Sequence, residues 1–415
     1  MRLRSILSKG LPAGLSAVML LSTPVMAAKK PKLDVGPPIA MSDSFRADLA
    51  QAEAAMRSGD VTTAGTRINA LVPTNDFETY TVAGLRFELA TRRRDVQAQR
   101  IALTDLFKTS ALPKKDAPRL RYVAGYLSYV VGNYDDATAQ LDYARTLGYD
   151  GVDATLLRAD IALRRNKPKD ARVFVQQALA QQRASGKPVP LPWIDRSISM
   201  AYQAGDWNEV GQLYRERLLQ TSERGEWRSA LTNYLAAASV DKELELDLYR
   251  LQAANGAMAS ERDYQAYAQL AEKAGYFAEA KSVIEAGRSA GKLTTTQPIT
   301  SALLKSVTPK ATKELAALPA QAKKAAAASS GKEAVEVGDS YFALSQFPQA
   351  VEQYRLALSK GGVDAGRVNT RLGVALARSG DLANGQAALA QASGNWASVA
   401  GFWSVWVAKQ SQKAA

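Results

Sequence analysis

Hydrophobic and polar positions follow a helical period along most of this chain, and short breaks interrupt that period at regular intervals. In residues 337–361, "VGDSYFALSQFPQAVEQYRLALSKG", the break falls at Ser345, with Phe347 two positions later and Ala350 three positions after that. On both sides of the break, apolar residues recur every three or four positions, as they do on one face of an α-helix. The segment therefore predicts two helices joined by a tight turn.

The same spacing of a turn residue, an apolar residue and a small residue recurs along the chain. The other copies are Gly59/Val61/Ala64, Gly132/Tyr134/Ala137, Asn166/Pro168/Ala171, Gly205/Trp207/Val210, Gly275/Phe277/Ala280 and Gly380/Leu382/Gly385. Successive copies lie about 35 or about 70 residues apart, so degenerate copies are implied near residues 93, 240 and 310. A period in this range predicts a solenoid of about ten units that bury their apolar faces by stacking.

The residues at the breaks explain why each unit is a hairpin. In "MRSGDV", "VVGNYDD", "YQAGDW" and "ARSGDL", a Gly follows a helical pattern and an Asp or Asn follows the Gly. A Gly at a helix end adopts the left-handed conformation that satisfies the last carbonyls, and the Asp or Asn caps the next helix. Small residues on the second helix, such as Ala137 and Ala350, then let the first helix approach closely.

This unit resembles the tetratricopeptide repeat (TPR), whose pattern places small residues at its eighth, twentieth and twenty-seventh positions. The matching residues are Gly338/Ala350/Ala357 and, less fully, Gly125/Ala137/Ala144 and Gly373/Gly385/Ala392. The resemblance covers most of the chain and implies an all-α fold, a right-handed α-solenoid of about ten helix-turn-helix repeats. Because TPR arrays are scaffolds for many partners, the resemblance by itself indicates no particular function.

Composition divides the chain into five segments. We expect a signal peptide at 1–27, a Pro-rich basic leader at 28–43, a TPR-like array at 44–293, a degenerate repeat or hinge at 294–330, and a C-terminal TPR pair with a Trp-rich capping helix at 331–415. The pattern weakens at 294–330 because "TTTQPIT" is turn-like and "ELAALPAQAKKAAAASSGK" has little to bury. A second irregular stretch, "RASGKPVPLPW", predicts a protruding loop before Trp193.

The N-terminus predicts the compartment. Arg2, Arg4 and Lys9 precede a short apolar stretch, and small residues at Val25 and Ala27 suit cleavage after Ala27. We therefore expect an exported, periplasmic protein whose mature chain has no transmembrane segment.

The amino-acid composition argues against an enzyme. The chain has no Cys and no His, so it lacks the usual transition-metal ligands and the usual general base at neutral pH. We expect no catalytic residues, no metal and no cofactor, and we find no phosphate-binding loop or nucleophile elbow.

The formal net charge of +13 falls to +10 without the three basic residues of the signal. Both signs are mixed along most helices, so a generally basic surface competes with a site for an anionic partner.

The resemblance implies that the first helix of each hairpin lines a concave face where an extended ligand binds. The residues in that register are Arg119, Tyr122, Tyr126, Tyr129, Asp160 and Arg164. Tyrosines offer a large contact area at low entropic cost and suit peptide or sugar contact. Aromatic residues at helical spacing also pack between helices, and both interpretations stay open.

Three basic clusters and a Trp-rich C-terminus can also be explained by structural roles alone. The clusters are Arg92/Arg93/Arg94, Arg164/Arg165/Lys167/Lys169 and Lys323/Lys324. The first two fall at helix ends, where cations favour the helix dipole, and the third is expected to be solvated. Trp396, Trp403 and Trp406 are interpreted as an end cap, with contact to a partner or a second copy, or a membrane interface, as alternatives.

Together these observations predict a non-catalytic scaffold or adaptor in the cell envelope that holds an extended protein partner on its concave face. The alternative is a polymer-handling protein that binds acidic exopolysaccharide or peptidoglycan through a basic groove. A third, remote option is an enzyme that uses carboxylates alone. We expect no nucleic-acid partner, and a homodimer remains an alternative.

Overall fold

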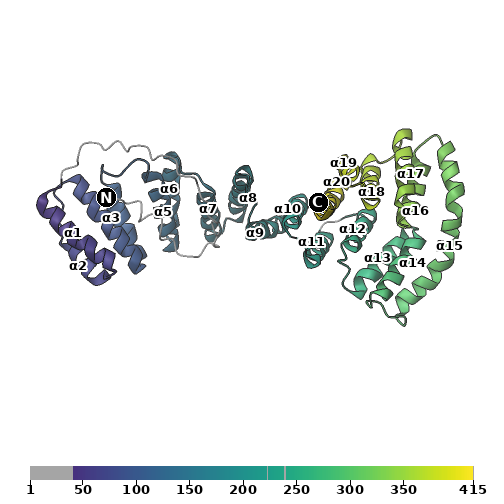
Figure 1. The fold of residues 1–415 in the computed structure, drawn as a ribbon, viewed down its shortest axis with the longest axis horizontal. Coiled ribbons are helices and arrows are strands. Elements are labelled where there is room, and N and C mark those ends of the chain that lie inside the picture. The colour runs from purple at the N-terminus through teal and green to yellow at the C-terminus, as the bar shows by residue number, and fades with distance from the viewer. Residues whose placement is uncertain (1–40, 222, 238–239, 415) are drawn as a thin grey trace. The chain divides into compact units, whose positions relative to one another are not determined.

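The computed structural model describes residues 41–221, 223–237 and 240–414, and these residues form helices without a strand (Figure 1). The predicted signal peptide and most of the predicted leader lie outside the described residues. The chain divides into two compact units, Met1–Pro188 (unit 1) and Val189–Ala415 (unit 2). The division falls inside the proline-rich stretch that was expected as a protruding loop. Val189 in this stretch is buried, and its carbonyl accepts a hydrogen bond from Gln220 at 3.0 Å.

In unit 1, residues 41–188 form four helical hairpins. Its helices are α1 (Asp43–Ser58), α2 (Val61–Ala70), α3 (Asp76–Arg93), α4 (Val96–Phe107), α5 (Ala117–Val130), α6 (Tyr134–Thr146), α7 (Val152–Arg164) and α8 (Pro168–Ala184). Each helix packs on the next one in sequence, and α5 also contacts α7.

The described residues of unit 2 form twelve helices. They are α9 (Leu191–Gln203), α10 (Trp207–Gln220), α11 (Arg224–Ala237), α12 (Lys242–Ala254), α13 (Glu261–Lys273), α14 (Phe277–Ser289), α15 (Pro298–Ala327), α16 (Lys332–Ala343), α17 (Phe347–Lys360), α18 (Ala365–Arg378), α19 (Leu382–Ala390) and α20 (Trp396–Ala414). The all-α class and the repeated hairpin fold expected from the sequence are therefore confirmed by the helices themselves.

The predicted turn register is confirmed residue by residue. Among the positive-φ residues, those at the turn inside a hairpin are Gly59 (80°), Arg94 (56°), Gly132 (79°), Asn166 (56°), Gly205 (69°), Gly275 (87°), Ser345 (58°) and Gly380 (96°). All seven copies found by spacing are among them, and Arg94 is the degenerate copy implied near residue 93. The expected caps also form: Asn133, for example, accepts a hydrogen bond from the backbone N–H of Asp136 at 3.2 Å.

The turn implied near residue 310 is wrong. Residues 298–327 form a single helix of 30 residues, α15, which packs on α14 and α16. Pro309 and Pro319 lie inside it, where proline removes a backbone hydrogen bond but does not end the helix. A buried stripe along α15 holds it in place. Its residues are Thr300, Val307, Ala311, Leu318 and Ala325. The copy implied near 240 borders residues 238 and 239, which lie outside the described part of the chain.

Small residues allow close helix contact at the predicted positions. A Cβ atom added to Gly338 on α16 would lie 2.8 Å from the ring of Tyr354 on α17. Ala350 and Ala357, on the facing side of α17, are fully buried. The absence of a side chain at residue 338 therefore sets the separation of the two helices.

The arginine cluster at residues 92–94 connects two hairpins of unit 1. The guanidinium of Arg93 donates to the carbonyl of Val61 at 2.5 Å, and Arg92 donates to the carbonyl of Met56. Arg165 makes an equivalent contact with the side chain of Asp135 in the preceding hairpin. These cations therefore stabilise the stacking of neighbouring hairpin turns.

Unit 2 is closed by its last helix. Helix α20 packs on α19 and also on α10, α12 and α18, so it joins the first hairpin of the unit to the last (Figure 1). Ser398 on α20 receives hydrogen bonds from Arg215 on α10, and Lys409 donates to the carbonyl of Leu219 at 2.7 Å. A Cβ at Gly401 would lie 2.8 Å from Nε of Arg215, so this contact depends on a glycine.

Candidate partner-binding surface and buried polar network

The predicted groove residues of unit 1 come from α5 and α7. They are Arg119, Tyr122, Tyr126 and Tyr129 on α5 and Asp160 and Arg164 on α7. Because α5 and α7 are in contact, the structure brings the six residues onto two neighbouring helices. The tyrosines differ in exposure: Tyr122 is buried, whereas Tyr126 and Tyr129 are half-buried.

Tyr122 packs between helices. Its ring stacks on Tyr149 with centroids 5.0 Å apart, and the hydroxyl of Tyr149 donates to Asp153 at 2.6 Å. Burial, followed by the nearby charge of Asp153, raises the pKa of Tyr122 above its ordinary value. Tyr122 is therefore in the environment that the packing interpretation describes. Tyr149 was missed by sequence reasoning because it lies between two hairpins, outside the repeated spacing.

Tyr129 and Arg164 form the polar end of the surface. The ring of Tyr129 lies 6.0 Å from that of Tyr134, and its hydroxyl is hydrogen-bonded to Arg164. The Tyr129 bond, with further contributions from nearby residues including Asp160, raises the pKa of Arg164. Leu163 precedes Arg164 on α7, and Val130 follows Tyr129 on α5. Their exposed fractions are 41% and 49%. We call the set Tyr126, Tyr129, Val130, Leu163 and Arg164 the α5–α7 surface.

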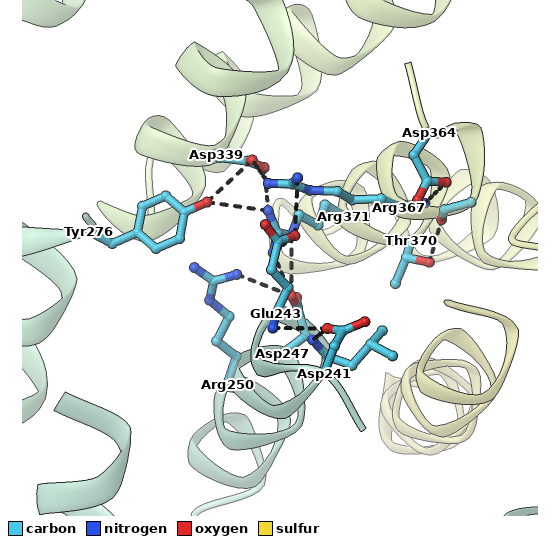
Figure 2. A network of polar contacts seen from close by, with 12 residues as sticks. Asp241, Glu243, Asp247, Arg250, Tyr276, Asp339, Asp364, Arg367, Thr370 and Arg371 are labelled. Atoms are coloured by element: carbon cyan, nitrogen blue, oxygen red, sulfur yellow. Dashed lines mark hydrogen bonds and ion pairs between the residues drawn. The ribbon is translucent and has the colours of Figure 1, made fainter. Parts of the chain in front are cut away.

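Unit 2 contains a buried network of charges that sequence reasoning did not identify (Figure 2). Arg371 on α18 donates to Asp247 on α12 at 2.8 Å and lies 2.8 Å from Asp339 on α16. Arg250 on α12 makes a two-pronged contact with Glu279 on α14, at 2.7 and 2.8 Å. All five side chains are buried. They connect four helices of unit 2.

Further groups balance the charge of this network. Arg367 donates to Asp339 at 2.5 Å, and the hydroxyl of Tyr354 donates to the same carboxylate at 2.7 Å. Burial opposes ionisation of Asp339, but Arg371, Arg367 and the Tyr354 hydroxyl hold the pKa of its carboxyl below the ordinary value. Burial alone would lower the pKa of Arg371, and Asp247 and Asp339 instead raise it well above its ordinary value. Asp339 and Arg371 therefore both carry charge at neutral pH.

One signal in the sequence pointed to the network. Asp339 directly follows Gly338, and Arg371 precedes Gly373 by two positions, so both charges occupy the tightly packed helices of their repeats. A charge in that register requires a partner. The partner Asp247 lies 124 residues from Arg371, and no local pattern identifies it.

The three predicted C-terminal tryptophans lie inside unit 2. Trp396, Trp403 and Trp406 are buried, and Trp403 and Trp406 meet edge to face with centroids 5.6 Å apart. The guanidinium of Arg371 lies over the ring of Trp396 at 5.3 Å, so α20 also contacts the buried network. In this position the rings cover the hairpins of the unit's own chain, and contact with a second copy stays a prediction.

A pocket of about 300 Å³ opens between α9, α10 and α11. Arg217 in its wall is paired with Asp195 at 2.7 Å and with Glu226. Both flanking carboxylates are therefore already engaged by a guanidinium. The described residues hold no group of three or more acidic side chains placed to bind a metal ion, and no described helix has the length and apolar composition to cross a membrane.

Several solved structures are similar to this chain. A TPR protein from Parabacteroides merdae is 12% identical over 72% of this chain and 99% of its own, with a TM-score of 0.33. The C-terminal part of a TPR repeat-containing protein from Cytophaga hutchinsonii is 11% identical over 71% and 99%, with a TM-score of 0.29. PilW, a type IV pilus biogenesis factor, is 13% identical over 53% and 96%, with a TM-score of 0.30. No protein-family model matches the sequence, and no curated protein does.

Proposed function

We propose that this protein is a non-catalytic scaffold of the cell envelope that binds an extended segment of a partner protein on the α5–α7 surface of unit 1. The observation that carries the proposal is the partial exposure of Tyr126 and Tyr129 on α5, together with the hydrogen bond between Tyr129 and Arg164 on α7. Tyr and Arg are the residues most often found at the centres of protein interfaces, and exposed Leu163 and Val130 add apolar area.

The filled interior of unit 2 is a reason to place the binding of the partner in unit 1. Unit 2 fills its interior with the buried charges and with α20, so these groups already have partners within the chain. In unit 1, α5 carries two half-buried aromatic rings, Tyr126 and Tyr129, that a partner could cover. A rigid surface formed before the partner arrives lowers the entropic cost of binding an extended segment.

The location in the envelope rests on the N-terminal segment of the sequence. Its basic residues, apolar stretch and small residues before Ala28 favour export and cleavage after Ala27. A fusion of residues 1–40 to a reporter that is active only after export tests this part of the proposal. Retention of the reporter in the cytoplasm would contradict it.

The alternative, binding of acidic exopolysaccharide or peptidoglycan on the same α5–α7 surface, has less support. Arg119 and Arg164 bring positive charge to α5 and α7, but Asp153 and Asp160 on α7 offset it. The other two arginines of these helices are engaged by α6, Arg121 through Gln140 and Arg158 through Asp142. A basic groove for a polyanion would need an excess of one sign.

The test is capture of a partner by the mature chain from an envelope extract. The test variant carries Tyr126→Ala, Tyr129→Ala and Arg164→Ala, and leaves buried Tyr122 intact. The matched control carries Tyr143→Ala and Arg145→Ala on α6, where Tyr143 is 48% exposed. We expect a discrete protein to be retained by the wild-type chain and the control and lost by the test variant. Retention by all three would place the partner elsewhere and overturn the proposal.

A further inference from the structure

Helix α15 carries the excess positive charge of unit 2. Residues 189–415 contain 25 basic and 22 acidic residues, but without residues 298–327 they contain 20 and 21. Helix α15 contains five lysines and a single acidic residue, Glu314. The remainder of unit 2 is therefore close to neutral, and its net charge lies on one element.

The five lysines occupy one side of this helix. They are Lys305, Lys310, Lys313, Lys323 and Lys324. At about 100° per residue, they fall within an arc of about 140°, while the buried stripe of α15 falls within about 40° on the opposite side. Packing on α14 and α16 therefore turns the lysines to solvent, and all five are exposed.

Most of these charges have no partner within the described part of the chain. Lys310 lies 4.0 Å from Glu272 and over the ring of Phe277. No ion pair or hydrogen bond engages the ammonium groups of the other four, Lys305, Lys313, Lys323 and Lys324. Glu314 accepts a hydrogen bond from the backbone of Ala278 and is thus turned towards α14. The lysine face contains no acidic side chain.

We propose that this lysine face, defined by Lys305, Lys313, Lys323 and Lys324, binds a linear carboxylated polysaccharide. The four ammonium groups extend over about 28 Å of a helix about 45 Å long, at 1.5 Å per residue. Small exposed residues, among them Ser306, Ala316 and Ala320, lie between them, so a flexible chain can approach the helix closely. Such a row suits a polymer with repeated negative charges rather than a single anion.

The composition of the face favours a polysaccharide over other polyanions. Protein interfaces are depleted in Lys and enriched in aromatic residues, and α15 has no aromatic residue. Single-stranded nucleic acids are bound with stacking aromatics, which are also missing. Helices that lie in a membrane interface insert an apolar face, and the apolar face of α15 is buried in unit 2.

The test measures fluorescence anisotropy of labelled oligogalacturonate with the mature chain at low salt. The variant replaces the four unpaired lysines with Gln. The control makes the same change in charge at four exposed lysines elsewhere, Lys114, Lys115, Lys187 and Lys292. We expect binding that weakens with salt, a loss of about tenfold or more in the variant, and little change in the control. Tryptophan fluorescence and circular dichroism establish that both variants are folded.

Other outcomes would overturn the proposal. They are no binding by the wild-type chain at low salt, equal losses in variant and control, or tighter binding of oligothymidylate or of phosphatidylglycerol vesicles than of oligogalacturonate. The inference is separate from the proposed protein-binding function. The triple variant of the α5–α7 surface should bind oligogalacturonate like the wild type, so failure of one proposal is distinguishable from failure of the other.

Discussion

The guanidinium of Arg371 and the carboxylate of Asp247 lie 2.8 Å apart with both side chains fully buried, although 124 residues separate them in the sequence. Their contact joins α18 to α12 across the interior of unit 2. Breaking a buried ion pair leaves one charge without compensation, which costs more than losing the attraction alone.

We expect Arg371→Met to lower the free energy of unfolding of unit 2 by about 3–5 kcal/mol. Urea unfolding followed by tryptophan fluorescence measures this change, because all six tryptophans lie at residue 193 or later and report on unit 2 alone. The double variant Arg371→Met/Asp247→Leu should recover part of the loss, since neither charge is then left unpaired. Additive losses in the two single variants and the double variant would show that the pair does not act as a unit.

Trp403 on α20 is 1% exposed, and its removal should open the closure of unit 2. Trp403→Ala should destabilise the unit by about 3–5 kcal/mol, because it leaves a large cavity in the interior of unit 2. The midpoint of the fluorescence transition measures the loss. Leu315→Ala, a change in the same unit at a side chain that is 49% exposed on α15, is the control and should change stability by less than about 0.5 kcal/mol. A transition unchanged by Trp403→Ala would mean that α20 contributes nothing to the stability of unit 2.

Ser345 adopts a left-handed conformation (φ 58°) at a turn position that holds glycine in most of the repeats. Ser345→Gly should raise stability by up to about 1 kcal/mol because glycine adopts this conformation without steric cost. The reverse change, Gly380→Ser, should lower stability by a similar amount, although a Cβ there would meet no atom within 4 Å. Thermal unfolding of both variants tests the prediction, and shifts of the same sign would contradict it.

Glu78 at the start of α3 accepts four hydrogen bonds. Both the backbone N–H and the hydroxyl of Ser42 and of Thr74 donate to it, at 2.7–3.2 Å. The backbone N–H groups of Thr74 and Ser42 are the largest causes, and they lower the pKa of Glu78 from 4.5 to about 2. Because the pKa of Glu78 is lower in the folded state than in the unfolded chain, its ionised carboxylate stabilises the fold at any pH above the unfolded-state pKa. This stabilisation is lost as the pH falls from 4.5 towards 2.

The variant Glu78→Gln should therefore be less stable than the wild type at neutral pH, and the difference should shrink as the pH falls through this window. Urea unfolding followed by circular dichroism, which detects both units, measures the difference at each pH. A difference that stays constant down to pH 2 would indicate a packing effect of the amide rather than loss of a charge.

The repeat and its turns could be predicted from the sequence because their determinants are local. A turn residue, a cap and a small residue lie within a few positions of one another, so Gly132 and Ala137 predict the hairpin of α5 and α6. The single helix α15 was missed because the break expected near residue 310 was inferred from spacing. Its alanines and lysines form helix readily without a turn residue.

The candidate sites were harder to predict because they depend on contacts between residues that are far apart in the sequence. Tyr126 and Tyr129 could be placed by helical register, but whether a ring is half-buried depends on α6 and α7. The pairing of Arg371 with Asp247 depends on the closure of unit 2, which no spacing in the sequence encodes. The lysine face of α15 follows from helical periodicity only after residues 298–327 are known to form one helix.

The closure of unit 2 by α20 has a consequence for how the chain is made. Ribosomes release the polypeptide from its N-terminus, and the hairpins of unit 1 need only neighbours that emerge within the same few dozen residues. Leu219 and Arg215, in contrast, wait for Ser398 and Lys409, which are synthesised more than 180 residues later. During most of that interval the sides of α10 and α12 that contact α20 lack their cover. The emerging protein thus exposes a temporary surface for chaperones or proteases, and the time that this surface stays open depends on how fast the rest of the chain emerges where it folds.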